Sequence, residues 1–209
     1  MSEDRKSEKT NLLYTYAIDD LKCEIAPCFT ADYKFRTIFE DQEYDLQLLD
    51  LACLEDYPKV RALSYPQTDV FILFFSLISP TSLENIENIW VPELKMNCPD
   101  PKFILVGGNS ALRDSFQEHY DEYKSKGWEP VPSRIGDEMR RKIQSIDYIE
   151  CDADSKYNVK EVFERAMHIA LHNIQFQDTE EKPHKTKKVS KFKQWKEKRK
   201  EKKSKKDKE

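Results

Sequence analysis

The sequence predicts an α/β domain with a mainly parallel sheet. Val70–Leu77 and Lys102–Val106 are apolar runs of the kind found in strands that are covered on both faces. Amphipathic helical patterns lie between and after these runs. Strands that alternate with helices favour a parallel sheet. The length of 209 residues suits one globular domain with an extension.

The N-terminal half is expected to hold a hairpin and a long helix. Tyr33–Glu40 and Tyr44–Leu51 have strand-like patterns, with a turn at Asp41-Gln42 between them. Pro80 opens a helical pattern that ends at Cys98–Pro101, where two prolines break it. The apolar positions of this helix are Leu83, Ile86, Ile89, Trp90 and Leu94.

The C-terminal half is expected to continue the alternation of helices and strands. Ser133–Ile146 and Val159–Ile174 have helical patterns, and Asp147–Cys151 between them is a short strand. From Asp178 onward lysine dominates. We therefore expect a charged N-terminal remnant at residues 1–10, a domain at 11–177 and a basic, disordered tail at 178–209.

The overall charge of −4 conceals two opposed blocks. Residues 182–209 contain 15 Lys/Arg and 4 Asp/Glu, whereas the rest of the chain contains 20 and 35. An acidic domain with a basic tail suggests contact of the tail with anionic lipid or nucleic acid. Solvated disorder is an equally good interpretation of the same tail.

The cysteines and the N-terminus favour an intracellular setting. The five cysteines are odd in number and show no CxxC pairing, which is typical of reduced thiols. Residues 1–10 are charged and do not resemble a signal peptide. The longest apolar stretch, Val70–Ile78, is far too short to span a bilayer. A cytoplasmic protein is expected, with peripheral membrane attachment or a nuclear location as alternatives.

One segment after the hairpin resembles a known switch. Leu48-Leu-Asp-Leu-Ala-Cys-Leu-Glu-Asp-Tyr57 is similar to the second switch of Rho/Rac-type small GTPases, Asp-Thr-Ala-Gly-Gln-Glu-Asp-Tyr. Other Rac-like runs are Tyr65–Phe71, Phe75–Pro80, Trp90–Glu93, Ile104–Gly107 and Leu112–Asp114. Asp114–Gly127 falls where Rho-family proteins have their insert helix. The resemblance implies a Ras-like three-layer P-loop GTPase fold that binds GTP or GDP with Mg²⁺.

The resemblance also assigns a nucleotide site, which is strongly altered. The phosphate loop of the family is glycine-rich, but Glu3–Thr10 contains no glycine and retains only the Lys-Thr pair. Base recognition is changed as well, because Gly108–Ala111 lacks the carboxylate that accepts two guanine N–H bonds. Vestigial Mg²⁺ ligands are expected at Thr10 and Asp50. The full set of vestigial nucleotide-binding residues is Lys9, Thr10, Asp50, Asn109, Ala111 and Ala153.

The switch residues implied by the resemblance are altered too. Cys28 stands where a threonine would bind Mg²⁺, and a neutral thiol is a poor ligand for this hard cation. Leu54 replaces the glutamine that orients the attacking water, so no catalytic residue is expected. The effector and switch residues are Ile25, Pro27, Cys28, Tyr33, Glu55, Asp56 and Tyr57.

A strand is missing from the family pattern. In the family it precedes the phosphate loop and lies between the strands that correspond here to Tyr44–Leu51 and Val70–Leu77. A gap there would leave backbone donors and acceptors unpaired. Either the two strands close on each other, or something else fills the slot, or the gene product is incomplete.

The histidines and the tail suggest weaker possibilities. His168 and His172 have the i, i+4 spacing that can bind a metal, but no third ligand is evident, and a solvated helix face is expected. The tail has no cysteine after Cys151, so no prenyl anchor is expected. An apolar stripe in a cationic helix would suit an anionic membrane, with nucleic acid as the less favoured partner. The tail contact residues are Phe192, Trp195, Lys198, Arg199 and Lys200.

These features together predict a Rac-like pseudo-GTPase. It would act as a binding module for Rho-family regulators or effectors, in the actin-cytoskeleton setting that the resemblance implies. One alternative is an atypical switch that binds GTP and remains in the GTP form. A second alternative is a basic-tailed adaptor for membrane or nucleic acid.

Overall fold

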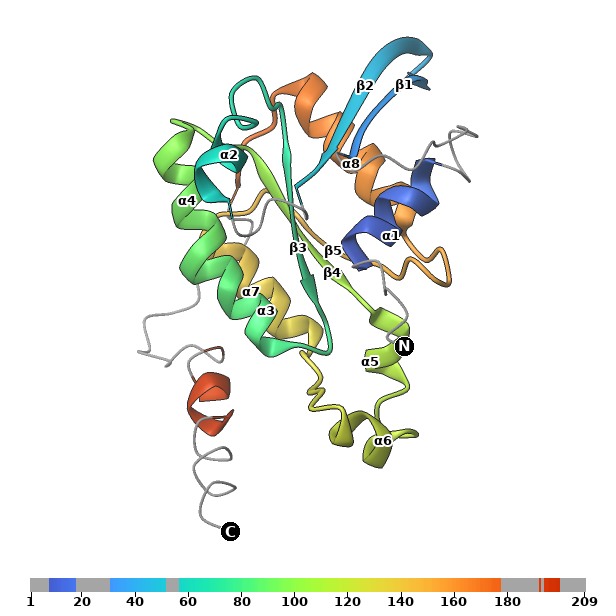
Figure 1. Ribbon diagram of the computed structural model, residues 1–209, viewed down its shortest axis with the longest axis vertical. Helices are drawn as coiled ribbons and strands as arrows, with labels where there is room; N and C mark the ends of the chain where they lie inside the picture. Colours follow the sequence, from blue (N-terminus) through green and yellow to red (C-terminus); the bar gives the residue numbers. More distant parts are fainter. Residues whose placement is uncertain (1–7, 18–30, 52–56, 178–191, 193, 200–209) are drawn as a thin grey trace.

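The computed structural model describes residues 8–17, 31–51, 57–177, 192 and 194–199. Its centre is a parallel sheet of three strands in the order β3-β4-β5, formed by Phe71–Ser76, Phe103–Gly108 and Tyr148–Glu150 (Figure 1). Helices connect these strands, as parallel pairing requires. The predicted α/β class and the predicted parallel sheet are confirmed.

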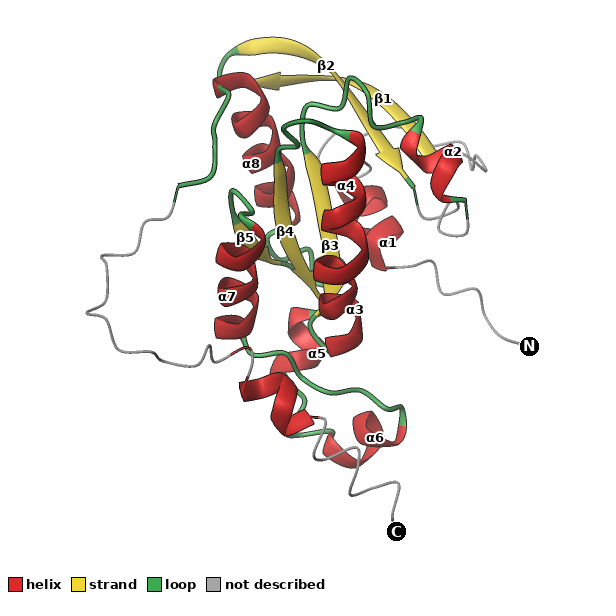
Figure 2. Cartoon of the chain, turned by 90° about the vertical axis from the view of Figure 1, so that its left-hand side faces the viewer, coloured by secondary structure: helices red, strands yellow, loops and turns green. Residues whose placement is uncertain are grey.

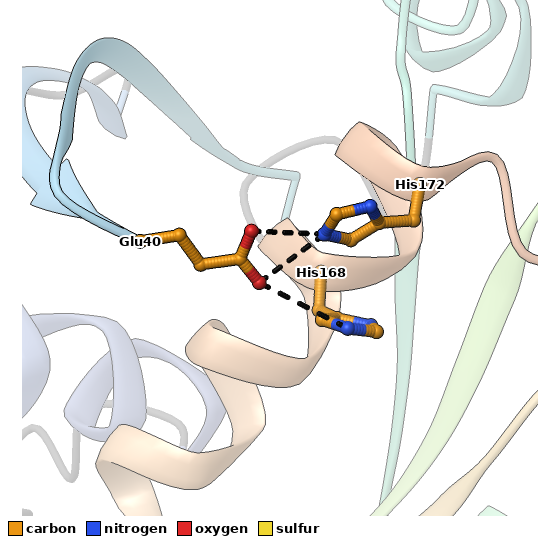
Figure 3. Close-up of side chains that lie close together, drawn as sticks. All are labelled: Glu40, His168 and His172. Carbon is orange, nitrogen blue, oxygen red and sulfur yellow. Dashed lines mark hydrogen bonds and ion pairs between the residues drawn. The ribbon is translucent and has the colours of Figure 1, made fainter.

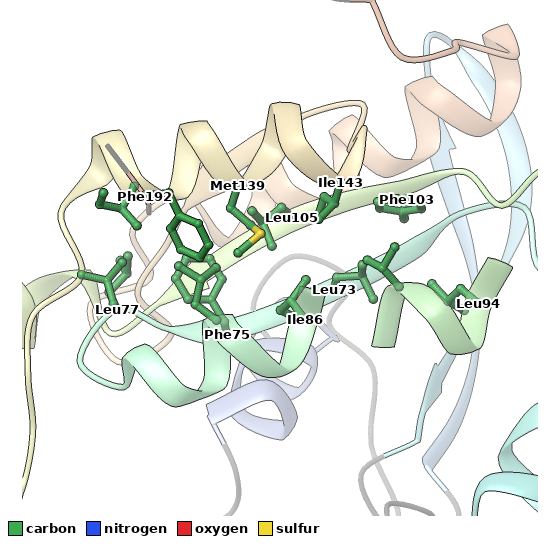
Figure 4. Packing of buried hydrophobic residues seen from close by; sticks show 14 of the residues in the cluster. Leu73, Phe75, Leu77, Ile86, Leu94, Phe103, Leu105, Met139, Ile143 and Phe192 are labelled. Carbon is green, nitrogen blue, oxygen red and sulfur yellow. The ribbon is translucent and has the colours of Figure 1, made fainter. Parts of the chain in front are cut away.

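Strand β4 lies in the middle of this sheet and is buried along its whole length. Phe103 and Leu105 point into one apolar cluster, which also contains Phe75 from β3 and Met139 and Ile143 from α7 (Figure 4). Ile104 and Val106 belong to a second cluster, to which α1 and α8 contribute. The alternation follows from the two-residue period of a strand and accounts for the continuous apolar run in the sequence.

The helices lie close to the expected positions. The apolar stretch after Pro80 is one continuous helix in which five residues adopt π-helical geometry between two α-helical parts. The elements are α1 (Glu8–Thr15), α2 (Pro58–Ala62), α3 (Pro80–Asn85), η3 (Ile86–Trp90), α4 (Val91–Asn97), α5 (Ser110–Asp114), α6 (Tyr120–Ser125), α7 (Ser133–Ile143) and α8 (Val159–His172). In the described part of the chain, no helix is long and apolar enough to cross a membrane.

The expected hairpin is present and forms a sheet of its own. β1 (Ala31–Phe39) pairs antiparallel with β2 (Gln42–Asp50), and the turn lies at Glu40-Asp41, one residue before its predicted position. Both turn residues have positive φ, 49° and 61°, as a two-residue type I′ turn requires. Figure 2 shows the hairpin above the parallel sheet, with its turn near the C-terminal end of α8.

The two sheets do not join. Within the described residues β2 pairs with β1, β3 pairs with β4, and no ladder connects β2 to β3. Of the alternatives for the missing strand, closure of these two strands on each other is therefore wrong. A cavity of about 520 Å³ lies between them. Its walls include Leu46 and Leu48 from β2, Ile72 and Phe74 from β3, Leu12 from α1 and Phe163 from α8.

Two predicted boundaries need correction. Helix α1 begins at Glu8, so Lys9 and Thr10 belong to a helix and not to a charged remnant that ends at residue 10. The expectation of a disordered tail is wrong for Phe192 and residues 194–199, which are helical and pack against the domain. Phe192 is 2% exposed within the cluster that contains Met139 (Figure 4), and hydrophobic burial explains why this part of the tail is held.

Acidic residues of the domain hold the same part of the tail. The backbone N–H of Phe192 donates to Glu138 Oε2 at 2.6 Å. Lys196 Nζ lies 3.3 Å from Glu87 Oε2. Arg199 donates to Glu84 Oε1 at 2.7 Å and to Glu129 Oε2 at 2.9 Å. The charge asymmetry of the chain is thus partly neutralised within the molecule.

Gly136 in α7 should not tolerate a side chain. A Cβ at this position would lie 2.7 Å from Cε1 of Tyr148 and closer still to its Cζ and hydroxyl oxygen. The hydroxyl of Tyr148 is fixed by its hydrogen bond to Glu150 Oε1 at 2.6 Å. Gly136→Ala, which stabilises an open helix by about 1 kcal/mol, should here destabilise the protein by roughly 1–3 kcal/mol in urea unfolding. In a Tyr148→Ala background, Gly136→Ala should no longer lower the free energy of unfolding. An equal loss of stability in both backgrounds would show that Tyr148 is not the obstacle.

Phe192→Ala should release the C-terminal helix. Loss of the buried ring should weaken docking by about 1.5–3 kcal/mol, observed as faster amide hydrogen exchange at residues 194–199. Lys198→Ala is the matched control because Lys198 is exposed in the same helix. Equal exchange rates in both variants would show that the ring does not hold the helix.

Candidate functional site

The residues assigned to the nucleotide site meet at one end of the parallel sheet. Ser76 ends β3, Asn109 follows β4, and Asp152 follows β5 by two residues. The carboxyl ends of parallel strands are the usual place for a ligand in an open α/β sheet. Helix α1 reaches this end, since the hydroxyl of Thr15 donates to the carbonyl oxygen of Ala153 at 3.4 Å.

The proposed magnesium residues are bonded to each other. Thr10 Oγ1 donates to Asp50 Oδ2 at 2.7 Å, and Lys9 Nζ lies 3.8 Å from Asp50 Oδ1. Asp50 is 7% exposed, and a buried carboxylate needs such partners. The structure therefore brings together the three residues that the sequence suggested, as an ion pair and a hydrogen bond. Hydroxyl and carboxylate oxygens are ligands of the type that Mg²⁺ prefers.

The base-side loops are tied together by Asp152. The backbone N–H of Ala111 donates to Asp152 Oδ2 at 3.1 Å, and the N–H of Ser155 donates to Oδ1 at 2.8 Å. Asp152 is 5% exposed, so both oxygens are committed to backbone partners in a buried position. Asn109 has φ 60°, and its Oδ1 accepts a hydrogen bond from Ser76 Oγ at 2.7 Å.

The carboxylate of Glu150, at the end of β5, also has fixed partners. Arg113 Nη1 donates to Glu150 Oε2, and the hydroxyl of Tyr148 donates to Oε1, both at 2.6 Å. Burial raises the pKa of Tyr148 above its ordinary value, and the hydrogen bond to Glu150 raises it further. The phenol therefore stays protonated and donates to the carboxylate throughout the physiological pH range.

Helix α2, which follows the segment that resembles the second switch, is anchored by a buried ion pair. Arg61 in α2 is 4% exposed and donates from Nε and Nη2 to the two carboxylate oxygens of Glu93 at 2.8 and 2.6 Å. Its guanidinium also lies 4.8 Å from the ring centroid of Trp90. A two-pronged contact of this kind fixes both position and orientation. Helix α2 is thereby fastened to η3 and α4.

Only two of the expected switch residues can be placed. Tyr57 is exposed immediately before α2. Tyr33 lies in β1, where its ring packs against Phe35 with centroids 6.2 Å apart. The remaining switch residues and one tail residue lie outside the described part of the chain: Ile25, Pro27, Cys28, Leu54, Glu55, Asp56 and Lys200.

No sequence pattern predicts the partners that Arg61 and Asp152 have in the structure. The pairing of Arg61 with Glu93 joins positions 32 residues apart, and no local pattern indicates it. The bonds of Asp152 to two backbone N–H groups depend on the packing of two loops, which the sequence does not reveal.

A comparison with protein families identifies the family of this chain. The family model described as "Ras family" matches residues 4–172. The matched span ends at the last residue of α8 and so includes both sheets and all the named helices.

The Arg61–Glu93 pair predicts a pH dependence of stability. The hydrogen bond from Arg61 lowers the pKa of Glu93 below its ordinary value, although burial opposes this effect. A lowered carboxyl pKa contributes stability above the ordinary pKa, and this contribution disappears as the pH falls through the folded-state value. Glu93→Gln should therefore cost roughly 3–5 kcal/mol in urea unfolding at pH 7, because it leaves Arg61 buried without its charge partner. The variant should also lose part of the acid dependence below about pH 5.

Glu122→Gln is the control, because Glu122 forms an exposed pair with Lys126. This variant should change stability little. If the two variants were equally stable, the pair would not anchor α2.

Proposed function

The chain belongs to the Ras family of small GTPases, and from this premise we propose that it acts in small-GTPase signalling as a Rac-like pseudo-GTPase. In this role it binds regulators or effectors, and its own guanine-nucleotide site is degraded. The single observation that carries the proposal is that the described remnants of this site bond to one another. Thr10 and Lys9 hold Asp50, and Asp152 holds the backbone of Ala111 and Ser155.

The hydrogen-bond acceptors at the base side of the site do not fit guanine. Position 111 is alanine, and the nearby carboxylates of Asp152 and Glu150 already accept two hydrogen bonds each. A guanine base that loses two charge-assisted hydrogen bonds loses roughly 1.5–3 kcal/mol for each. Together they correspond to roughly two to four orders of magnitude in affinity.

The segment that the resemblance assigns to the phosphate loop is also poorly suited to bind the phosphates of a nucleotide. Residues 3–10 contain no glycine, so side chains occupy positions where backbone N–H groups would need to approach the phosphates. At the positions that the resemblance assigns to the phosphate loop, Glu3, Asp4 and Glu8 would also set negative charge against a polyanion. Lys9, Thr10 and Asp50 could hold a magnesium ion only if their present bonds were exchanged for metal and phosphate contacts.

Hydrolysis is expected to be absent even if some nucleotide binds. Leu54 has no group that could orient an attacking water, and orientation of this water is the main catalytic contribution of the residue it replaces. A protein that binds GTP in spite of its altered site would therefore remain in the GTP form. This atypical switch is the alternative to a pseudo-GTPase.

The Rac-like assignment rests on the runs of matching sequence and on α6. The helix lies within residues 114–127, where the resemblance places the insert helix, and Tyr123 is buried in it. Arg61 fastens α2 to Glu93. A helix held in one position favours a binding surface for partners whose shape does not change with nucleotide. An actin-related role in the cytoplasm is what the resemblance implies.

The burial of Phe192 counts against a tail that presents its aromatic stripe to a membrane. The side chain of Arg199, which is 13% exposed, is likewise engaged by Glu84 and Glu129. A membrane contact through these residues would require the helix to leave the domain. We therefore propose that proteins, and not lipid or nucleic acid, are the main binding partners.

Nucleotide content tests the proposal directly. The full chain, purified without added nucleotide and then denatured, should release far less than one equivalent of GTP or GDP. Titration with a fluorescent GTP analogue should show weak binding that Ala111→Asp strengthens, because the aspartate restores an acceptor for guanine. Ala111→Asn is the matched control, since it has a similar shape without the charge.

Stoichiometric GDP in the wild-type protein would overturn the proposal. Stoichiometric GTP would also overturn it and would establish the locked switch. Equal effects of Ala111→Asp and Ala111→Asn would contradict the assignment of residue 111 to the base site.

A further inference from the structure

Three metal-ligating side chains meet far from the nucleotide-site residues. His168 and His172 lie one turn apart on α8, and Glu40 approaches them from the turn of the β1–β2 hairpin (Figure 3). Both carboxylate oxygens of Glu40 lie close to His172 Nε2, at 3.1 and 3.0 Å. His168 Nε2 lies 4.0 Å from Glu40 Oε1. The sequence suggested no third ligand for the two histidines, and the structure corrects this expectation.

The geometry points to a site for a divalent cation of the zinc type, formed by Glu40, His168 and His172. One ligand atom from each side chain can be chosen so that all three lie within 4.8 Å of one another. Zinc binds imidazole nitrogen and carboxylate oxygen at about 2.0–2.2 Å, so tetrahedral ligands stand roughly 3.4 Å apart. The observed separations of 3.0 and 4.0 Å lie on either side of this value, and small side-chain rotations would bring the ligands into place.

The donor set selects the class of metal. Two imidazoles and one carboxylate suit zinc and similar transition metals, whereas Mg²⁺ and Ca²⁺ prefer sites made entirely of oxygen. The side chains are 39–46% exposed, so water can occupy the fourth position. The two residues on α8 are held at a fixed spacing by a regular helix, which reduces the cost of ordering the ligands.

The ring of His168 provides a second observation. Its Nδ1 is buried and has no hydrogen-bond partner within the part of the chain that the structure describes. The ring is therefore oriented by packing, with Nε2 facing the carboxylate. A metal bound at Nε2 would place the proton of the neutral imidazole on Nδ1.

A metal bound at this site would link the β1–β2 hairpin to α8. Among the described residues, no ladder joins the hairpin to the parallel sheet, and helix α1 packs against its strand β2. Glu40 joins the tip of the hairpin to α8 across 132 positions of sequence. Helix α8 and strand β2 also line the cavity between the sheets. A bound cation would thus fix the hairpin over this cavity.

Metal titration of the full chain tests the inference. Zn²⁺ should bind with one equivalent in competition with a chromophoric chelator and should raise the melting temperature. Glu40→Gln and His172→Asn should each lower the affinity by at least about tenfold, because removal of a ligand costs no less than removal of a supporting partner. His119→Asn is the matched control, since His119 is an exposed histidine outside the cluster.

Melting temperatures without metal separate a lost ligand from a damaged fold. The exposed cluster variants should melt close to the wild type in the presence of a chelator and should differ from it only when Zn²⁺ is added. Absence of zinc binding by the wild type would overturn the inference and leave a Glu40–His172 hydrogen bond alone. Equal affinity of the wild type, His172→Asn and His119→Asn would also overturn it, because the metal would then bind elsewhere.

Discussion

Strand β4 is the constraint on which the rest of the structure depends. Its six residues are buried, and the side chains of Phe103, Ile104, Leu105 and Val106 alternate between the two apolar clusters that the helices cover. Because every side chain of this strand faces a packed layer, neither layer can shift without opening the other. Packing is equally tight at Gly107, where a Cβ would lie 3.0 Å from Leu77 and 3.1 Å from Phe75. The strand delivers Asn109 and Ala111 to the end of the sheet where the candidate site lies.

The hairpin is not held by the packed layers around β4 in the same way, because its sheet is separate from the parallel sheet. A continuous sheet would have tied β2 to β3 by backbone hydrogen bonds, but the two strands stand on opposite sides of a cavity of about 520 Å³. The hairpin is therefore positioned by side chains: Asp50 at one end contacts Thr10, and Glu40 at the other end contacts His172. Both contacts involve a carboxylate, Asp50 in one and Glu40 in the other.

Charge is distributed so that the domain and its extension attract each other. The acidic residues that hold Lys196 and Arg199 come from two separate segments: Glu84 and Glu87 lie in the helix after Pro80, and Glu129 lies before α7. Surface ion pairs contribute little individually. The burial of Phe192 provides the apolar contact around which these pairs form. A basic tail is therefore not by itself a sign of a membrane or nucleic-acid partner, since this domain offers a partner of its own.

The sequence by itself determined the elements and the family. The apolar run of β4, the helix after Pro80 and the face of α8 have periods that local geometry imposes, so they could be predicted without knowledge of the fold. The changes at positions 54 and 111 could be read in the same way, because each removes a chemical group whatever the surrounding structure is. Only the tertiary structure decided which groups meet: Asp152 with the backbone of Ala111, Arg61 with Glu93, and Glu40 with the two histidines of α8. These contacts join residues between 32 and 132 positions apart, and a sequence pattern carries no information about such distances until packing has fixed them.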